Sequence, residues 1–93
     1  MFIDQKTDGE VREEVISTTK DIKDLILFND DVHTFDFVIK SLMRICSHSA
    51  EQAEQSAYIV HNNGKCTVKH GEVSKIKPMC KALTDQGLTA EVK

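Results

Sequence analysis

The polar residues best suited to binding are concentrated between Asn29 and Phe35. This stretch runs Asn-Asp-Asp-Val-His-Thr-Phe and combines an amide, two adjacent carboxylates, an imidazole and a hydroxyl. Asn and Asp are also common in turns and at helix N-termini, so a structural role is the simple alternative. Two adjacent acids repel one another, however, and one cap would have been enough. The stretch is therefore the first candidate binding site.

A second candidate is His61, which is followed by Asn-Asn-Gly-Lys near the predicted end of an apolar helix. A histidine at a helix C-terminus commonly interacts with the helix dipole or lies half-buried. In the functional alternative, its imidazole is a hydrogen-bonding group that faces a pocket.

The cysteines offer little support for an enzyme. Cys46, Cys66 or Cys80 could pair with His61 as nucleophile and base, but cysteines at apolar helix positions more often pack in a core. The sequence has no glycine-rich nucleophile elbow, phosphate loop or dinucleotide fingerprint. The two adjacent acids cannot be assumed to face one substrate. We therefore predict that the protein is not an enzyme.

The potential metal ligands also lack the spacing of known sites. Cys66 could converge with His48, His61 and His70, but no pair has zinc-finger or zinc-ribbon spacing. With three cysteines and no secretory signal, the thiols are predicted to be reduced and mostly buried. We expect no metal and no cofactor.

Composition limits the class of partner. The chain has 93 residues, of which 40% are apolar, which is typical of one folded domain. Residues 1–31 hold nine acids and four bases (−5), residues 32–93 hold six acids and eight bases (+2), and the net charge is −3. The pI near 5.7 disfavours nucleic acid as a partner. The lysine-rich segment 65–81 suits an acidic protein surface.

No segment indicates a membrane protein or an exported one. The apolar run Leu25–Phe28 has four residues, whereas a membrane span needs about 20. The N-terminal Met-Phe-Ile is followed by Asp4 and lacks the basic and apolar regions of a signal peptide. We therefore expect a cytoplasmic protein that does not contact membranes.

Hydrophobic spacing predicts a folded core preceded by a tail. Residues 1–23 are rich in charge and poor in apolar side chains, so we predict a flexible N-terminal extension there. Residues 24–93 are predicted to form the core domain. Within it, Leu25–Phe28 is predicted as a buried strand that ends in a turn.

Two helices are predicted next. In the first, Thr34 is the predicted N-cap and apolar residues recur at helical spacing as far as Cys46. In the second, Ser49 is the predicted N-cap, and the Asn-Asn-Gly that ends at Gly64 is a C-terminal signal.

The last third of the chain completes a β-α-α-β-α-β order. Residues 65–69 are a strand candidate and residues 70–71 a turn. Apolar spacing predicts a third helix from Val73 to before Gly87, which Pro78 would either delay or kink near Ser74. Residues 88–92 alternate as an edge strand. The predicted class is α+β, with three helices on one face of a small, mainly antiparallel three-stranded sheet.

Several of these segments resemble the signature of the ClpS family, the adaptors of ClpA/ClpC-type AAA+ unfoldases and of the Clp protease. Within Leu25–Val38, residues 29–34 are similar to the family's N-D-D-x-x-T/P pattern. Residues 35–38 are similar to the hydrophobic, acidic, aromatic and valine positions that follow it in the family. Val60–Lys65 is similar to its A-V-H-x-x-G-K pattern, at the matching distance. Residues 72–77 resemble its E-V-x-x-x-K pattern. The resemblance covers residues 24–93.

The resemblance implies an adaptor that binds proteins by an N-terminal Phe, Leu, Tyr or Trp (an N-degron) and delivers them to the unfoldase for proteolysis, acting as a monomer. The α-amine would be bound by acceptors on Asn29, Asp30 and His61. The apolar side chain would enter a pocket of Phe35, Val38 and Val60, with Asp31, His33 and Leu88 at the rim, and Glu72 and Lys77 would contact the unfoldase.

Some residues depart from the common family pattern, and the loop after Lys65 is shorter. The chain has His33-Thr34 where the family often has Thr-Pro. It has Phe35 and Ala57 at two positions where the family often has Met. Pro78 is also atypical. A larger side chain at the pocket mouth and a smaller one in its wall would change which first residues are accepted.

Two alternatives have different functions. The same element order resembles the C-terminal domain of the ribosomal stalk protein, and element order alone cannot separate the two folds. A small cysteine hydrolase is the other alternative, which thiol alkylation would distinguish. The Asn-Asp-Asp motif together with His61 favours the adaptor.

Overall fold

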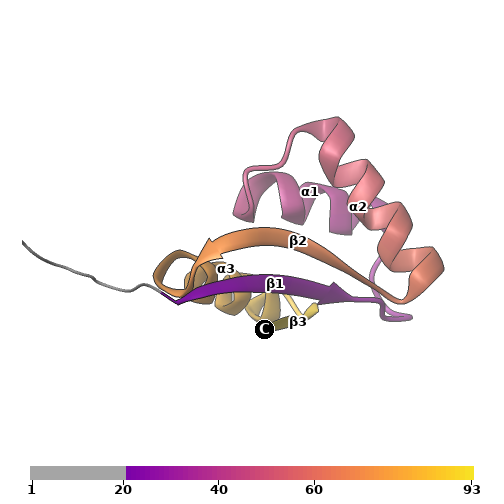
Figure 1. Ribbon diagram of the computed structural model, residues 1–93. Coiled ribbons are helices and arrows are strands. Elements are labelled where there is room, and N and C mark those ends of the chain that lie inside the picture. Colours follow the sequence, from indigo (N-terminus) through magenta and orange to yellow (C-terminus); the bar gives the residue numbers. More distant parts are fainter. Residues whose placement is uncertain (1–20) are drawn as a thin grey trace, which may run out of the picture.

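The structure is a computed structural model that describes residues 21–93, so most of the predicted extension over residues 1–23 lies outside the described residues. The elements are β1 (Ile22–Phe28), α1 (Phe35–Ile45), α2 (Ala50–Asn63), β2 (Lys65–Glu72), α3 (Val73–Asp85) and β3 (Thr89–Val92) (Figure 1). This order confirms the predicted β-α-α-β-α-β arrangement and the α+β class.

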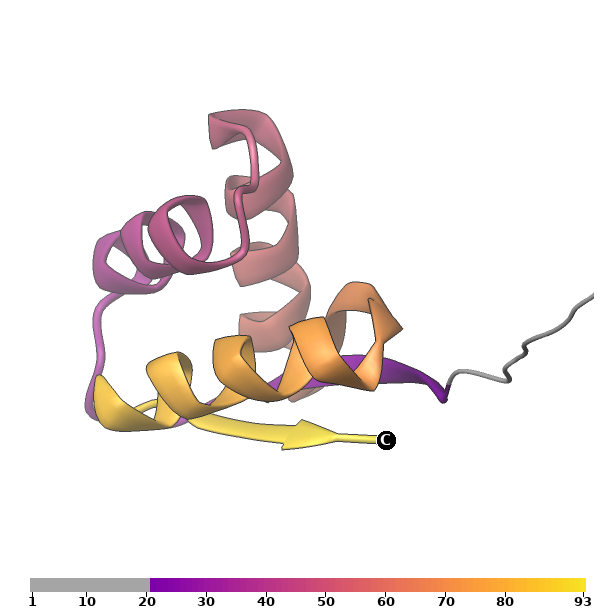
Figure 2. The same ribbon diagram turned by 90° about the vertical axis from the view of Figure 1, so that its left-hand side faces the viewer.

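The central strand of the sheet is β1, because the strand order is β2-β1-β3 and both pairings are antiparallel. Leu25 and Leu27 are fully buried on one face, whereas Ile26 between them is partly exposed, as the two-residue period of a strand requires. All three helices pack on the buried face (Figures 1 and 2). The core joins these leucines to Leu42 of α1, Ala53 and Val60 of α2, Ile76 and Leu83 of α3, Val68 of β2 and Ala90 of β3.

Both predicted N-caps are confirmed. The Oγ1 atom of Thr34 accepts a hydrogen bond from the backbone N–H of Phe37 at 3.0 Å, and the Oγ atom of Ser49 accepts one from the N–H of Gln52 at 3.1 Å. Each bond satisfies a backbone donor that the first helical turn leaves without a partner. The start of α1, and with it the position of Phe35, is thereby fixed by local sequence.

Gly64 ends α2 and also connects it to β1. Its φ of 91° is left-handed, a conformation that glycine adopts without steric cost. Its N–H donates to the carbonyl of Val60 (2.9 Å), and its own carbonyl accepts a bond from the N–H of Asn29 (2.8 Å). The end of β1 and the end of α2 are therefore held side by side.

The first two strands are longer than predicted. β1 begins at Ile22, so Ile22 and Lys23 are part of the sheet and not of the extension. β2 continues through the predicted turn at residues 70–71 as far as Glu72. Pairing explains both differences: Ile22 lies opposite Glu72, and Asp24 lies opposite His70, with their side chains in contact.

The third helix runs through Pro78. α3 begins at Val73 directly after β2, which excludes the delayed start, one of the two alternatives that the sequence left open. Proline has no N–H, so the carbonyl of Ser74 receives no bond from position 78. Pro78 is exposed, and the burial of Ile76 and Leu83 holds α3 against the sheet. Within residues 21–93, no helix is both long and apolar enough to cross a membrane.

Candidate functional site

A cavity of about 380 Å³, the main cavity, opens where the end of β1, the start of α1 and the C-terminal half of α2 meet. Its walls consist of polar residues from the loop after β1 and of residues from the two helices. They are Asn29, Asp30, Asp31, His33, Phe35, Val38, Ala57, Val60 and His61. The residues predicted from the sequence as amine-binding, pocket-forming or rim residues therefore come together, with the exception of Leu88.

The interior of the main cavity is apolar and its opening is polar. Ala57 and Val60 are 2% and 3% exposed, and Val38 is half-buried. Asn29 and His61, by contrast, are exposed. An apolar group can be buried inside this cavity while a polar group attached to it meets hydrogen-bonding side chains at the opening.

Two rings border the opening from different helices. Phe35, the first residue of α1, is 40% exposed. Its ring stands edge-on to the imidazole of His61, with ring centroids 6.5 Å apart and planes at 89°. Phe35 is therefore placed to limit the shape of a group that enters beside His61.

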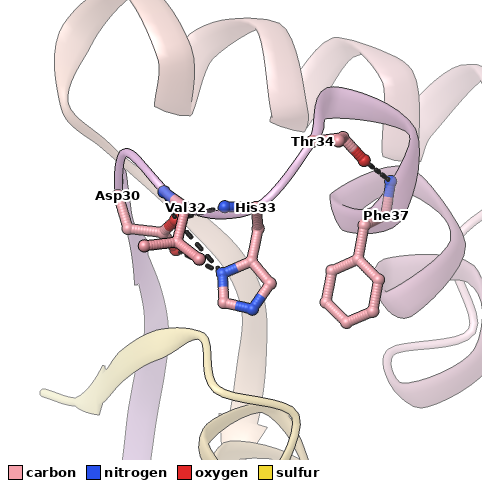
Figure 3. A network of polar contacts seen from close by, with 5 residues as sticks. All are labelled: Asp30, Val32, His33, Thr34 and Phe37. Atoms are coloured by element: carbon pink, nitrogen blue, oxygen red, sulfur yellow. Dashed lines mark hydrogen bonds and ion pairs between the residues drawn. The ribbon is translucent and has the colours of Figure 1, made fainter.

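The carboxylate of Asp30 shapes the loop that follows β1. Its Oδ1 atom accepts bonds from the backbone N–H groups of Val32 (2.9 Å) and His33 (2.8 Å), and both its oxygens lie 3.1 Å from Nδ1 of His33 (Figure 3). Partial burial would raise the pKa of Asp30, but these hydrogen bonds outweigh it and lower the pKa below its usual value. Asp30 is therefore ionised at neutral pH and already has hydrogen-bond partners.

His33 connects this loop to two other parts of the fold. Its ring stacks on Phe37 of α1, with centroids 4.9 Å apart and planes at 24°. Its Nε2 atom lies 3.1 Å from the position that a Cβ atom on Gly87 would occupy, and Gly87 has a φ of +88°. A side chain at position 87 would therefore crowd the imidazole, which would have to move by a few tenths of an ångström, and it would strain the backbone. Sequence reasoning assigned His33 to the rim and missed this contact.

Leu88 was predicted at the rim, but the structure places it in the core. It is 4% exposed and packs with the core residues. Its N–H donates to the carbonyl of Leu83 at 3.1 Å, so it closes the end of α3, and β3 begins only at Thr89. The left-handed turn at Gly87 directs the chain back toward the sheet and Leu88 into the interior.

Glu72 and Lys77, the predicted unfoldase-contacting residues, are not part of the main cavity. Glu72 pairs with Ile22 at one end of β1, whereas Asn29 follows the other end. Seven residues of strand separate the two ends by about 20 Å. Lys77 is exposed on α3, and Glu72 is partly buried at the start of that helix.

The cysteines form no reactive centre in the described part of the chain. Burial raises the pKa of the Cys46 thiol to about 11, although the charge of Lys69 opposes the shift. Burial also raises the pKa of Cys66 and of Cys80. These thiols are protonated at neutral pH and are poor nucleophiles. Among residues 21–93, no group of three or more His, Cys, Asp or Glu side chains could hold a metal ion.

Most of the chain matches the model of one known protein family. Residues 18–91 match the family model described as ATP-dependent Clp protease adaptor protein ClpS. The chain belongs to the ClpS family. This match confirms the resemblance in the Asn-Asp-Asp and Val-His motifs, and it favours the adaptor over the ribosomal stalk domain. ClpS is described as an adaptor of a protease and not as a protease.

Two curated ClpS proteins give the extent of the similarity. ATP-dependent Clp protease adapter protein ClpS of Campylobacter jejuni subsp. jejuni is 42% identical over 55 residues, which are 57% of this chain and 57% of that protein. The corresponding protein of Wolinella succinogenes is 34% identical over 70 residues, which are 73% of this chain and 69% of that protein. The match thus spans 57% of the length of the Campylobacter relative.

A solved ClpS structure has the same fold. ClpS2 of Agrobacterium tumefaciens, bound to L-phenylalaninamide, superposes with a TM-score of 0.73 and 22% sequence identity. The superposition covers 81% of this chain and 100% of the ClpS2 chain.

The role of Asp30 in the loop can be tested by removing its charge. A carboxyl group whose pKa is lower in the folded state stabilises that state above its unfolded pKa, and the stabilisation is lost as the pH falls through the folded pKa. Asp30→Asn should therefore lower the free energy of unfolding at pH 7 by about 1 kcal/mol. The difference from wild type should shrink below about pH 4. Urea unfolding at pH 7 and pH 3 measures both.

The control is Asp31→Asn, which removes the same charge from the neighbouring exposed residue. It should leave the unfolding free energy nearly unchanged at both pH values. Equal losses in the two variants would mean that overall charge, and not the hydrogen bonds of Asp30, explains the effect.

Proposed function

We propose that the protein is an adaptor that binds other proteins by a hydrophobic N-terminal residue and delivers them to a Clp AAA+ unfoldase for proteolysis. The observation that carries this proposal is the main cavity, which has an apolar interior and acceptors at its opening. Family membership supports the adaptor role. The ligand of the ClpS2 structure supports the chemistry, because L-phenylalaninamide carries a free α-amine next to a phenyl side chain.

The amine-binding part of the proposal rests on Asn29, Asp30 and His61. An α-amine has a pKa of about 7.7–8.0, so it is largely a cation with three donors at neutral pH. Among the described residues, the side chains of Asn29 and His61 have no hydrogen-bond partner, so both are available as acceptors, His61 through a neutral ring nitrogen. Asp30 acts mainly through its charge, directly or through a water, because Val32 and His33 already donate to its Oδ1 atom.

The apolar part of the proposal rests on Phe35, Val38 and Val60, with Ala57 in the inner wall. Burial of one large apolar side chain contributes about 1.5–3 kcal/mol. That is too little for useful affinity without the amine contacts. A ligand should therefore need both a free amine and a large side chain, which fits N-terminal Phe, Leu, Tyr or Trp. Asp31 and His33 complete the rim.

Delivery requires a second surface, for which we propose Glu72 and Lys77. Glu72 lies about 20 Å from Asn29 along β1, and neither Glu72 nor Lys77 lines the main cavity, so a substrate bound there would leave both residues accessible. A ClpA-type or ClpC-type unfoldase is the proposed partner, and we expect the adaptor to act as a cytoplasmic monomer without contacts to nucleic acid or membranes.

Acetylation of the ligand tests the amine contacts. A short peptide that begins with Phe or Leu should bind with a free amine, and its acetylated form should show no measurable binding. Asp30→Ala should weaken the binding of the free-amine peptide by about 1.5–3 kcal/mol, the range for hydrogen bonds to charged groups. Isothermal titration measures both.

The control is a free-amine peptide that begins with Gly, which should bind poorly because it lacks a side chain for the pocket. If the acetylated peptide binds as well as the free one, the proposed function fails.

Phe35 should determine which first residues fit. A β-branched residue carries bulk next to its amine, where the rigid Phe35 ring would collide with it, whereas Phe and Leu place their bulk deeper. Ile and Val should therefore be rejected, and Ala57 leaves room for Tyr and Trp. Phe35→Ala should raise the affinity for Ile and Val relative to Leu, because a steric exclusion has been removed.

A competition series of Phe-, Leu-, Trp-, Ile- and Val-initiated peptides measures this effect. Met43→Ala is the matched control, because Met43 is also 40% exposed on α1 but does not line the main cavity. An unchanged order of preference in Phe35→Ala would show that Phe35 only packs at the start of α1.

Charge changes on α3 test the partner surface. Lys77→Glu and Glu72→Gln should each weaken unfoldase binding by about twofold to fivefold, the range for exposed ion pairs, and leave peptide affinity unchanged. Lys75→Glu is the control, because it makes the same charge change two positions away on α3. Fluorescence anisotropy with a ClpA-type and a ClpC-type unfoldase gives the affinities. Equal loss of peptide and unfoldase binding would contradict two separate surfaces.

A further inference from the structure

A second cavity, of about 650 Å³, adjoins the main cavity. Its walls are Phe35 and four residues of α2, namely Glu51, Glu54, Gln55 and Tyr58. Phe35 also lines the main cavity, so its ring stands between the two cavities.

The four α2 residues of the second cavity form one stripe along that helix, and the stripe leads to His61. Positions 51, 54, 55 and 58 share one face of a helix, and His61 continues that face three residues after Tyr58. At about 1.5 Å per residue, Glu54 lies about 10 Å along the helix axis from His61. An extended chain covers about 3.3–3.6 Å per residue. A protein held by its first residue at His61 can therefore place its second to fourth residues over this stripe.

The two glutamates leave the stripe with uncompensated negative charge. Within residues 21–93, neither Glu51 nor Glu54 has an ion pair or a side-chain hydrogen bond. Exposed acids on the other helices do have partners: Asp36 pairs with Lys40 at 3.1 Å and Asp85 with Lys81 at 2.9 Å. Glu51 interacts favourably with the helix dipole from the first turn of α2. Glu54 lacks this benefit, and like charges three positions apart repel each other.

The aromatic walls favour the same kind of ligand as the glutamates. Tyr58 is 62% exposed and Phe35 is 40% exposed, so both present ring surface to the second cavity. Aromatic faces attract cations, and the planar guanidinium group of arginine stacks on them. Two carboxylates and two aromatic rings that line one cavity therefore form a site suited to an arginine or a lysine side chain.

We propose that the second cavity binds a basic side chain at the second, third or fourth position of the protein whose first residue occupies the main cavity. The inference rests on the proposed function, because it needs a polypeptide anchored at His61. The protein would thus distinguish between substrates with the same first residue by the charge of the residues that follow it.

The experiment uses short free-amine peptides that begin with Phe and carry Arg, Gln or Glu at the second, third or fourth position in a neutral background. Fluorescence anisotropy at low salt gives the affinities for the full chain. Arg should improve affinity over Gln by about twofold to fivefold at one or more of these positions, and Glu should reduce it. Raised salt should diminish both effects, because surface charges are screened.

The double variant Glu51→Gln, Glu54→Gln should abolish the advantage of Arg and leave the affinity for the Gln peptide unchanged. Glu91→Gln on β3 is the matched control, because it removes the same kind of charge from an exposed residue outside both cavities. It should keep the advantage of Arg. An equal advantage in the double variant and in wild type overturns the proposal, as does an advantage that is lost in Asp31→Asn instead.

The outcomes separate this inference from the proposed function. If binding needs the free amine and the first side chain but ignores the charge of later residues, the inference alone fails. If no free-amine Phe peptide binds, the proposed function fails and the inference fails with it.

Discussion

The backbone hydrogen bond from Asn29 to the carbonyl of Gly64 (2.8 Å) joins the two parts of the chain that form the site. Asn29 directly follows the central strand, and Gly64 caps the end of the helix that carries His61. The bond is possible because Gly64 adopts a left-handed φ of 91°, which ends the helix and turns its carbonyl toward β1. The side chains of Asn29 and His61, 32 positions apart in the sequence, thereby reach the same opening, and the cavity between them depends on this connection.

The loop after β1 is ordered before any ligand arrives. Asp30 accepts bonds from Val32 and His33 (Figure 3), and the His33 ring stacks on Phe37 and lies close to Gly87. A loop that is already fixed loses little conformational entropy on binding, which favours affinity. Asp30 thus has two roles: it stabilises the loop through hydrogen bonds and places a negative charge near the cavity.

Local rules in the sequence predicted much of the fold but not all of it. The starts of α1 and α2 and the end of α2 follow from Thr34, Ser49 and Gly64, because caps depend on neighbouring residues. The extra length of β1 and β2 depends on pairing between Ile22 and Glu72, which are far apart in sequence. The contact of His33 with Gly87 is equally distant. The grouping of Asn29 with His61 came from family motifs, and only the fold explains it.

The ring of Phe35 is one wall for two cavities, which has a consequence for how selectivity can change over evolutionary time. A substitution at position 35 alters both compartments at once, so it cannot adjust one preference and leave the other unchanged. Ala57 lines only the main cavity and Glu54 only the second. These two positions are therefore the independent routes by which descendants of this sequence could diverge, whereas position 35 couples the two choices.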